Sequence, residues 1–493
     1  MSAADEPVLP ASIRGAAERF GDRVAYVTPR GWDLTYHALD RLSDEVAAGL
    51  AHRGVRPGDV VALLFPPGPE YLLSYCGAAK LGAITAGVND RLSVPERAAV
   101  LDAAAARLVL TAEEFPAADD AATVLADLRR TDAETARLAA DPERPVAIVF
   151  TSGTTGVPKG ALYCDRQLAF ITATDTGGVW DGGGRTQSGT SYAHLGFMTK
   201  LPGALRRGGT TFIMERWRAR DALEMIARER MTNVAGVPTQ LALMLRDPIF
   251  DDLDLSSVTT IIAGGGPVTP GLAEEARRRF GARLATRYSC TEAGIGLGTA
   301  FDDPEEDAIV SVGRPLAGVD LAVRVPGDPD GPNVPAGEIG EVCLRSPAVM
   351  AGYWRDPDQT RSAFTADGFV RTGDLGAIDA QGRLRLVGRG KEMYVRGGYN
   401  VHPVEVEQVL STHPAVAAIA IVPRPDPVMG EVGVAVVVVR AGHSAPGLGD
   451  LRRHAADRLA AYKLPEDLRT IAALPLTAGD KIDRRALATE VAG

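Results

Sequence analysis

The segment AIVFTSGTTGVPKGALY, residues 147–163, decides the fold that we expect for this chain. Its first four residues are apolar and predict a short buried strand. The strand runs directly into a loop of Gly, Ser and Thr that leads to Lys159. Glycines let consecutive N–H groups turn toward one anion, hydroxyl groups add donors, and a lysine adds charge. The segment therefore predicts a phosphate-binding loop, although Pro158 before the lysine excludes the Walker pattern.

Apolar runs on both sides of this segment alternate with helical patterns. Residues 40–54 predict a helix that Gly54 closes. Further buried strands are predicted at residues 60–65, 210–214 and 259–264. Such alternation indicates an α/β fold with layered subdomains, in which ligands gather at the ends of strands.

The pattern changes after Arg314, where Gly and Pro separate short apolar runs and indicate a small β-subdomain. Residues 384–403 are rich in glycine, lack a core pattern and lead into a helical run, so we place a domain boundary there. The remainder predicts an apolar strand at residues 432–439 and a helix at residues 451–460, which suit a small mobile α+β domain. The predicted parts are an N-terminal domain at residues 1–387, a hinge at 388–391 and a C-terminal domain at 392–493.

Composition limits the possible functions. The chain has 493 residues, with 63 acidic and 53 basic side chains, a net charge of −10 and a pI near 5.4. No overall positive field would attract nucleic acid or anionic lipid. The N-terminal sequence lacks a secretion signal and no apolar run approaches the ~20 residues of a membrane span, so we expect a cytoplasmic protein. The four cysteines show no CxxC spacing, which favours reduced thiols over disulfides or a structural zinc site.

Several short segments, in a fixed order, carry a resemblance to a known family. They are TSGTTGVPKG (151–160), AGGGP (263–267), YSCTE (288–292), RTGDLG (371–376), GRGKEM (388–393) and PLTAGDKIDRRAL (475–487). Their order and spacing resemble those of the adenylate-forming superfamily, which includes acyl-CoA synthetases, amino-acid adenylation domains and beetle luciferase. The resemblance covers nearly the whole chain. It implies an AMP-forming acid–thiol ligase that uses ATP, magnesium and coenzyme A.

The resemblance assigns the phosphates of ATP to two of these segments. The β- and γ-phosphates would be gripped by Thr151, Ser152, Gly153, Thr154, Thr155, Gly156 and Lys159. Glu292 resembles the magnesium ligand of the family, a role that suits a hard carboxylate oxygen, and Thr291 resembles the residue that binds the α-phosphate. The structural alternative for Glu292 is a charge at the start of a helix.

The resemblance assigns the nucleoside to segments further along the chain. Adenine would be enclosed by the ring of Tyr288 and by the backbone of Gly265, Gly266 and Pro267. Asp374 resembles the aspartate that accepts hydrogen bonds from both ribose hydroxyls, and Arg389 resembles its partner near the hinge. The structural alternatives are a core aromatic residue for Tyr288 and a turn residue for Asp374.

Lys481 resembles the catalytic lysine of the family, whose ammonium would bridge the substrate carboxylate and the α-phosphate in the transition state. Relatives usually have Gly before this lysine. Here Asp480 stands there, a residue that tolerates a left-handed conformation or could pair with Lys481. Lys391 occupies the hinge position, and the hinge would permit one domain arrangement for adenylation and another for thioester formation. Gly397 and Gly398 resemble the loop that lines the pantetheine tunnel of CoA ligases.

The acid substrate is expected to be bulky or aromatic and not an α-amino acid. No Asp or Glu occurs between residues 182 and 214, where relatives that activate α-amino acids place an Asp. The candidate residues of the acid pocket are His194, Phe197, Gly264 and Gly294, of which the glycines would leave room for the acyl group. Cys290 is not expected to act as a nucleophile, because the sequence shows no GxSxG elbow or obvious base partner.

These observations predict ATP-dependent activation of a carboxylic acid to an acyl-adenylate with release of pyrophosphate, followed by thioester formation with coenzyme A. One alternative is a stand-alone enzyme that loads an acyl carrier protein, because it would share every motif through Lys481. A second alternative is a nucleotide-binding regulatory protein without turnover.

Overall fold

The apolar runs predicted as buried strands near the start of the chain lie in one largely parallel sheet. The computed structural model describes residues 6–132, 136–151, 158–390 and 392–492. Contacts divide the chain into two units, of which unit 1 holds residues 1–218, 290–295 and 346–364 and unit 2 holds the remainder. Both units mix helices and sheets, which confirms the predicted α/β class.

The central sheet of unit 1 carries the predicted phosphate loop. Its strands, in spatial order, are β17 (Gly352–Tyr353), β7 (Lys159–Cys164), β6 (Pro145–Thr151), β4 (Ile84–Gly87), β3 (Val60–Leu64) and β5 (Leu108–Thr111). Strands β3 to β6 run parallel, whereas β7 and β17 are antiparallel additions at one edge. Because a parallel sheet is covered on both faces, its strands are apolar throughout, and β4 is fully buried.

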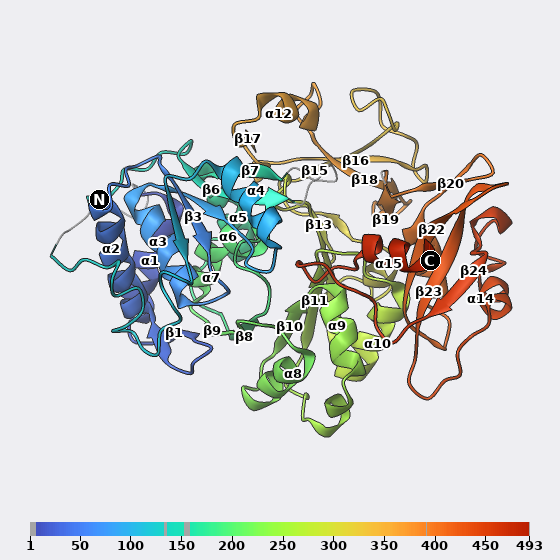
Figure 1. The fold of residues 1–493 in the computed structure, drawn as a ribbon, viewed down its shortest axis with the longest axis horizontal. Helices are drawn as coiled ribbons and strands as arrows, with labels where there is room; N and C mark the ends of the chain where they lie inside the picture. Colours follow the sequence, from blue (N-terminus) through green and yellow to red (C-terminus); the bar gives the residue numbers. More distant parts are fainter. Residues whose placement is uncertain (1–5, 133–135, 152–157, 391, 493) are drawn as a thin grey trace. The chain divides into compact units, whose positions relative to one another are not determined.

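Helices of this unit pack on the sheet or on the helices that cover it (Figure 1). They are α1 (Val8–Phe20), α2 (Tyr36–His52), α3 (Pro69–Leu81), α4 (Val94–Ala104) and α5 (Asp165–Thr176). Helix α3 is buried along its whole length. The helix predicted at residues 40–54 is α2, which begins four residues earlier, because the Thr35 side chain accepts a hydrogen bond from the backbone N–H of Ala38 and caps it.

A second sheet of unit 1 contains the predicted strand at residues 210–214. Its order is β2 (Asp33–Thr35), β1 (Val24–Val27), β9 (Thr210–Ile213) and β8 (Arg185–Ser188). The remaining described helices of this unit are short: α6 (Leu195–Met198), α7 (Leu201–Arg207) and α12 (Pro357–Ala363).

Unit 2 begins with a sheet whose parallel strands end at two of the predicted site segments. These strands are β10 (Asn233–Gly236), β11 (Thr260–Gly264) and β12 (Arg283–Tyr288), followed by antiparallel β13 (Leu297–Gly298) and β14 (Arg314–Pro315). The associated helices are α8 (Ala219–Arg228), α9 (Pro238–Arg246), α10 (Pro270–Phe280) and α11 (Asp307–Val310), with a 3₁₀ helix, η2 (Pro248–Asp252).

The β-rich region predicted after Arg314 is an antiparallel sheet. Its order is β15 (Asp320–Arg324), β16 (Gly340–Arg345), β18 (Val370–Ile378) and β19 (Leu384–Arg389). The inner strand β16 is buried from Gly340 to Leu344.

The C-terminal sheet lies in the same unit. Its strands are β20 (Tyr394–Arg396), β21 (Tyr399–Val401), β22 (Val416–Asp426), β23 (Gly430–Val439) and β24 (Asp467–Thr470), and its helices are α13 (Pro403–Leu410), α14 (Leu448–Ala455), η3 (Ala461–Lys463) and α15 (Arg484–Ala492). The expectation that residues 384–403 lack a core pattern is wrong, because Tyr394 and Val401 belong to the buried core of this sheet. The predicted helix at 451–460 is also too long, since α14 ends at Ala455.

The predicted boundary near residue 387 falls inside unit 2, and the domain division stays a prediction.

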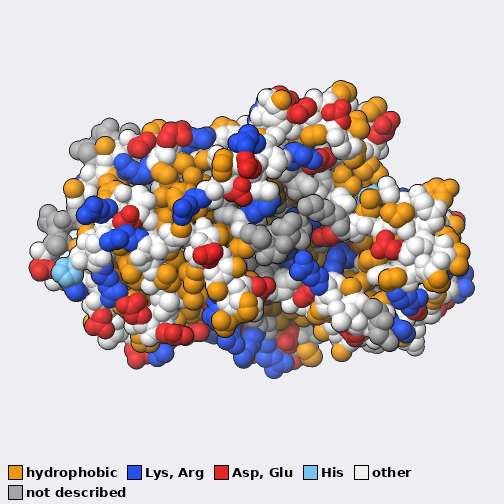
Figure 2. Space-filling view, turned by 45° about the horizontal axis from the view of Figure 1, so that its top comes forward, with side chains coloured by type: hydrophobic (Ala, Val, Ile, Leu, Met, Phe, Trp, Pro, Cys, Tyr) orange, Lys and Arg blue, Asp and Glu red, His pale blue; other side chains and the backbone are white. Residues whose placement is uncertain are grey.

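All four cysteines are buried and none forms a disulfide, as expected from their spacing. No helix in the described part of the chain has the length and hydropathy of a membrane span. Acidic and basic side chains are interspersed over the face shown in Figure 2, in agreement with the absence of an overall positive field.

Candidate active site

Strands β6 and β7, which flank the predicted phosphate loop, pair antiparallel. Thr151 ends one strand and Lys159 begins the next, and the two residues face each other in the antiparallel register. The hydroxyl of Thr151 donates to the carbonyl oxygen of Lys159 at 3.4 Å. Gly160 is needed beside them, because a Cβ there would lie 2.5 Å from the side chain of Ile148. The predicted residues Ser152, Gly153, Thr154, Thr155 and Gly156 lie outside the described residues.

Two neutral side chains, those of Gln359 and Tyr353, contact the ammonium group of Lys159. Its Nζ donates to Oε1 of Gln359 at 2.5 Å and lies 5.2 Å from the centroid of the Tyr353 ring. The second contact follows from the sheet, because β17 pairs with β7 and places Tyr353 opposite Ala161. A ring face attracts an ammonium without cancelling its charge.

Glu292 contacts the hydroxyl group of the same tyrosine. The Tyr353 hydroxyl donates to Oε1 of Glu292 at 2.7 Å, and the backbone oxygen of Glu292 accepts from the N–H of Met350 at 2.9 Å. Burial and the neighbouring Glu292 carboxylate raise the pKa of Tyr353, so its hydroxyl stays a neutral donor. Thr291 is fixed through its backbone oxygen, which accepts from the hydroxyl of Tyr163.

We call Lys159, Tyr353, Glu292 and Gln359 the phosphate-side cluster. The structure brings together two residues predicted from distant motifs, Lys159 and Glu292, through a tyrosine that sequence reasoning did not single out. Tyr353 lies in the sequence GYW at residues 352–354, which gave no chemical reason to choose the tyrosine.

The cluster suits magnesium held together with phosphates. Glu292 offers carboxylate oxygen, which Mg²⁺ prefers, and Mg²⁺ is commonly bound by one or two carboxylates plus substrate phosphates. Within residues 6–132, 136–151, 158–390 and 392–492, no group of three or more His, Cys, Asp or Glu is arranged to hold a metal by itself. In the phosphate-side cluster, Glu292 is the carboxylate that fits such a metal.

In unit 2, the glycine segment and Tyr288 follow adjacent parallel strands. Gly264 of β11 lies opposite Arg287 of β12, so the two strands end side by side. A Cβ on Gly264 would lie 2.7 Å from the carbonyl oxygen of Arg287, and Gly265 has φ of +79°. The close approach and the left-handed backbone explain the glycines at this turn.

Tyr288, Asp374 and Arg389 form a second network, which we call the nucleoside-side cluster. The Tyr288 hydroxyl donates to one oxygen of Asp374 at 2.7 Å, and Nε of Arg389 donates to the other at 2.9 Å. Asp374 lies opposite Arg389 in the β18–β19 register and is buried. Each carboxylate oxygen has two lone pairs, so the two oxygens together can accept further hydroxyl groups. The structure thus joins three predicted residues through the carboxylate of Asp374.

Lys481 is exposed at a tight turn. The carbonyl of Lys481 accepts from the N–H of Thr477 at 2.7 Å, and the N–H of Asp480 donates to the carbonyl of Thr477 at 3.0 Å. Asp480 has φ of +57°, the left-handed conformation expected at the place where relatives usually have Gly.

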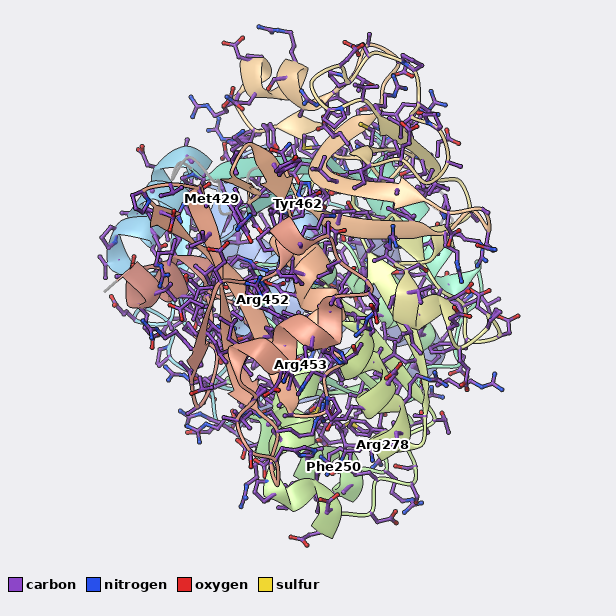
Figure 3. The ribbon with its side chains drawn as sticks, turned by 90° about the vertical axis from the view of Figure 1, so that its right-hand side faces the viewer. Phe250, Arg278, Met429, Arg452, Arg453 and Tyr462 are labelled. Carbon is purple, nitrogen blue, oxygen red and sulfur yellow. The ribbon has the colours of Figure 1, made fainter. Side chains whose placement is uncertain are left out.

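The glycine pair expected to line the thiol tunnel forms the β20–β21 turn. Gly397 has φ of +56°, and its N–H donates to the carbonyl of Met429 at 2.8 Å. A Cβ on Gly397 would lie 2.6 Å from Cε of Met429, and Gly398 also has positive φ. Figure 3 labels Met429 and also Tyr462, whose ring stacks on Tyr399 just after the turn at 4.6 Å between centroids. Lys391, the predicted hinge residue, lies outside the described residues.

The candidate acid-binding residues of unit 1 take different positions. His194 is exposed and caps α6, since its Nδ1 accepts from the N–H of Gly196 at 3.3 Å. Phe197 stacks on Tyr192 with 3.8 Å between centroids. A Cβ on Gly294 would lie 2.4 Å from the backbone oxygen of Ala348, so this glycine has a packing role, and its part in an acid pocket stays a prediction.

Comparison with known proteins identifies the family. The AMP-binding enzyme family matches residues 13–354, and the AMP-binding enzyme C-terminal domain matches residues 405–481. This chain belongs to the AMP-binding enzyme family. The match confirms the resemblance that the ordered motifs indicated.

Individual relatives of this AMP-binding enzyme cover nearly its whole length. It is 35% identical over 478 residues to a feruloyl-CoA synthase from an Amycolatopsis species, covering 94% of this chain and 95% of the relative. It is 33% identical over 479 residues to the fatty acid–[acyl-carrier-protein] ligase ScoC of Streptomyces coeruleorubidus, covering 93% and 91%. The structure of the anthranilate CoA ligase AuaEII in complex with anthranoyl-AMP matches with a TM-score of 0.87 and 26% identity, covering 100% and 99%. These findings confirm the prediction of an AMP-forming ligase of the acyl-CoA synthetase type and disfavour a protein without turnover.

Proposed function

We propose that this enzyme activates a bulky or aromatic carboxylic acid with ATP and transfers the acyl group to the thiol of coenzyme A. The observation that carries the proposal is the nucleoside-side cluster, in which Asp374 accepts from both Tyr288 and Arg389. A buried carboxylate that is held from two sides is a preorganised acceptor for a pair of neighbouring hydroxyl groups.

The proposal assigns each part of the nucleotide to particular residues. Asp374 accepts the ribose hydroxyls, while the Tyr288 ring and the glycine segment from Gly265 to Pro267 enclose adenine. Lys159 and the loop after Thr151 neutralise the β- and γ-phosphates, and Thr291 binds the α-phosphate. Glu292 would hold magnesium, which when bound screens the negative charge of the phosphates.

Lys481 supports the first step. An oxygen of the substrate carboxylate attacks the α-phosphorus, the new P–O bond forms, and the bond to pyrophosphate breaks. Both reactants are anionic, so the ammonium of Lys481 would stabilise charge that builds up between them.

The second step is proposed to use the turn at Gly397 and Gly398. The thiolate of coenzyme A attacks the carbonyl carbon of the acyl-adenylate, a C–S bond forms, and the C–O bond to AMP breaks. Positive φ at both glycines makes a turn without side chains, which a pantetheine arm can approach closely. We propose that a hinge at residues 388–391 joins a domain at 1–387 to a lid at 392–493 and lets the two steps alternate.

The acid is proposed to enter beside His194, Phe197, Gly264 and Gly294. The absence of Asp and Glu between residues 182 and 214 leaves the region without a partner for an α-ammonium group. Two of the similar proteins are named for aromatic acids, ferulic acid and anthranilic acid, which supports an aromatic substrate.

A carrier-protein acceptor is the second candidate, favoured by the similarity to ScoC, whose name gives an acyl carrier protein as its acceptor. Measuring AMP release with each acceptor distinguishes the two candidate functions. The enzyme should be incubated with ATP, Mg²⁺ and a panel of aromatic, polycyclic, fatty and α-amino acids, with either coenzyme A or a phosphopantetheinyl carrier protein. We expect AMP release and an acyl-CoA product by mass spectrometry with an aromatic or polycyclic acid. Release only with the carrier protein would overturn the coenzyme A assignment, and activity restricted to α-amino acids would overturn the acid assignment.

A further inference from the structure

The turn that carries Lys481 is attached to helix α9 through its aspartate. Oδ2 of Asp480 accepts a hydrogen bond from Nε2 of Gln240 at 3.4 Å. Gln240 lies in the first turn of α9 and is only 2% exposed. Its Oε1 accepts from the N–H of Val237 at 3.2 Å, so the cap of the helix fixes which end of the amide points toward Asp480.

The far end of α9 holds the chain that leads to the same turn. Nη2 of Arg246 donates to the carbonyl oxygen of Ala472 at 3.0 Å. Arg246 is the last residue of α9, whereas Gln240 lies near its start. The stretch from Ala472 to Asp480 is thus tied to both ends of one helix.

The start of α9 also borders the glycine segment of the nucleoside side. A Cβ on Gly265 would lie 3.3 Å from the side chain of Val237, and one on Gly266 would lie 3.5 Å from Pro238. The attachment point of the Lys481 turn is therefore next to the backbone proposed to enclose adenine.

The left-handed backbone of Asp480 and the hydrogen bond of its side chain are two separate features of this position. A glycine would adopt a φ of +57° more readily than an aspartate, so the turn itself does not require a side chain. What the aspartate adds is an acceptor for Gln240. An interaction with the neutral amide also gives its carboxylate a partner other than the adjacent lysine.

We propose that Asp480 is a positioning residue, which through Gln240 holds the Lys481 turn against α9 in the arrangement that serves adenylation. The proposal rests on the proposed role of Lys481. It also explains why an aspartate can replace the usual glycine. Asp480 keeps the left-handed conformation of a glycine and adds a hydrogen bond to Gln240, which we call the tether.

The test uses the full-length enzyme with an acid that supports ATP–pyrophosphate exchange. Asp480→Gly keeps the left-handed turn and removes the acceptor, Gln240→Met removes the donor, and Asp480→Asn keeps an acceptor oxygen. We expect each of the first two variants to lower the kcat of exchange about three- to tenfold, with the KM for ATP within about twofold of the parent. Asp480→Asn should stay within about twofold of the parent, and the double variant should be no slower than either single one. Thioester formation from added acyl-adenylate and coenzyme A should not change.

Asp181→Gly is the matched control, because Asp181 is also a left-handed aspartate, with φ of +75°, that bonds Arg23 in unit 1. It should leave exchange unchanged. Exchange in Asp480→Gly at or above the parent rate, or losses that multiply in the double variant, would overturn the proposal.

A second measurement does not depend on turnover. Hydrogen–deuterium exchange of residues 476–482 should be faster in Gln240→Met than in the parent, and equal rates would overturn the tether. If the parent showed no pyrophosphate exchange with any acid while this difference persisted, the proposed function would fail and the tether would stand.

Discussion

The phosphate-side cluster of unit 1 and the nucleoside-side cluster of unit 2 are built alike but differ in how the cation is held. Each contains a tyrosine whose hydroxyl donates to a carboxylate at 2.7 Å, Tyr353 to Glu292 and Tyr288 to Asp374. On the nucleoside side Arg389 bonds the carboxylate directly, whereas on the phosphate side Lys159 contacts the tyrosine ring and a neutral amide.

This difference matches the ligands that we propose. A ribose is neutral, so a carboxylate whose charge is balanced by an arginine suits it. Phosphates are strongly anionic, so a lysine held by neutral groups keeps its full charge for them. Under this proposal, the partner of the cation, and not its presence alone, distinguishes the hydroxyl site from the phosphate site.

The largest effect in this comparison should come from Asp374→Ala. The change removes the shared carboxylate and with it two proposed hydrogen bonds to ribose. We expect the KM for ATP to rise about 30- to 100-fold, as for the loss of charged hydrogen bonds, with the KM for the acid unchanged. Steady-state exchange kinetics measure both constants.

Asp379→Ala is the control for this change, because Asp379 lies one residue beyond β18 and forms an ion pair with Arg383 at 2.7 Å. It should leave the KM for ATP as in the parent. An Asp374→Ala enzyme with normal ATP affinity would show that the nucleoside-side cluster is structural.

The second-largest effect should distinguish Tyr353 from Tyr288. Tyr353→Phe keeps the ring beneath Lys159 and removes the bond to Glu292, which no other side chain of the phosphate-side cluster orients. We expect the Mg²⁺ concentration for half-maximal exchange to rise about tenfold. Calorimetric titration of ATP, with and without Mg²⁺, should show that only the metal-dependent part of binding is lost.

Tyr288→Phe should have the smaller effect of about threefold, because Arg389 still holds Asp374. It should raise the KM for ATP without changing the Mg²⁺ dependence. Equal Mg²⁺ dependence in the two variants would contradict the division into a phosphate side and a nucleoside side.

The sequence predicted all three residues of the nucleoside-side cluster but not the tyrosine that joins Lys159 to Glu292 in the phosphate-side cluster. Lys159 stood out from the chemistry of its loop, whereas Glu292, Tyr288, Asp374 and Arg389 stood out because their segments resemble those of the family. Tyr353 did not, since a tyrosine beside a glycine and a tryptophan reads equally well as core.

Local patterns had a similar limit in the fold. The buried strands were recognisable from apolar runs, whereas β20 and β21 were missed because each has three residues and the turn between them is a glycine pair. Their burial depends on pairing of β20 with β23, more than thirty residues away, which no local pattern contains.

The acceptor side should respond more weakly still. Gly397→Ala adds a Cβ at positive φ and at 2.6 Å from Cε of Met429, so the turn must shift. We expect the KM for coenzyme A to rise about twofold while pyrophosphate exchange is unchanged. Gly442→Ala has a similar φ of +77° with nothing within 4 Å and should leave the KM for coenzyme A unchanged.

The smallest effect on turnover is expected from Asp165, a residue of neither cluster. Burial raises the pKa of Asp165 to about 6, while its Oδ1 accepts from the N–H of Val8 at 2.8 Å. The folded protein therefore binds more protons than the unfolded chain between its ordinary pKa of 3.8 and about 6, and this group makes stability fall as pH rises through that window.

Asp165→Asn keeps the acceptor oxygen and removes the buried charge. It should raise the free energy of unfolding by about 1–2 kcal/mol at pH 7, and the gain should shrink at pH 5. Denaturant titrations at the two pH values, beside exchange assays, check this expectation. A gain that does not depend on pH would contradict the buried charge as its cause.

The central claim is that this enzyme activates a carboxylic acid on ATP with Lys481 as the catalytic cation. Acid-dependent ATP–pyrophosphate exchange, measured for the parent and for Lys481→Ala across the acid panel, tests it most directly. We expect the parent to exchange with a bulky or aromatic acid, and Lys481→Ala to lose about 100-fold or more while still converting added acyl-adenylate and coenzyme A to thioester. Undiminished exchange in Lys481→Ala, or no exchange by the parent with any acid, would contradict the account.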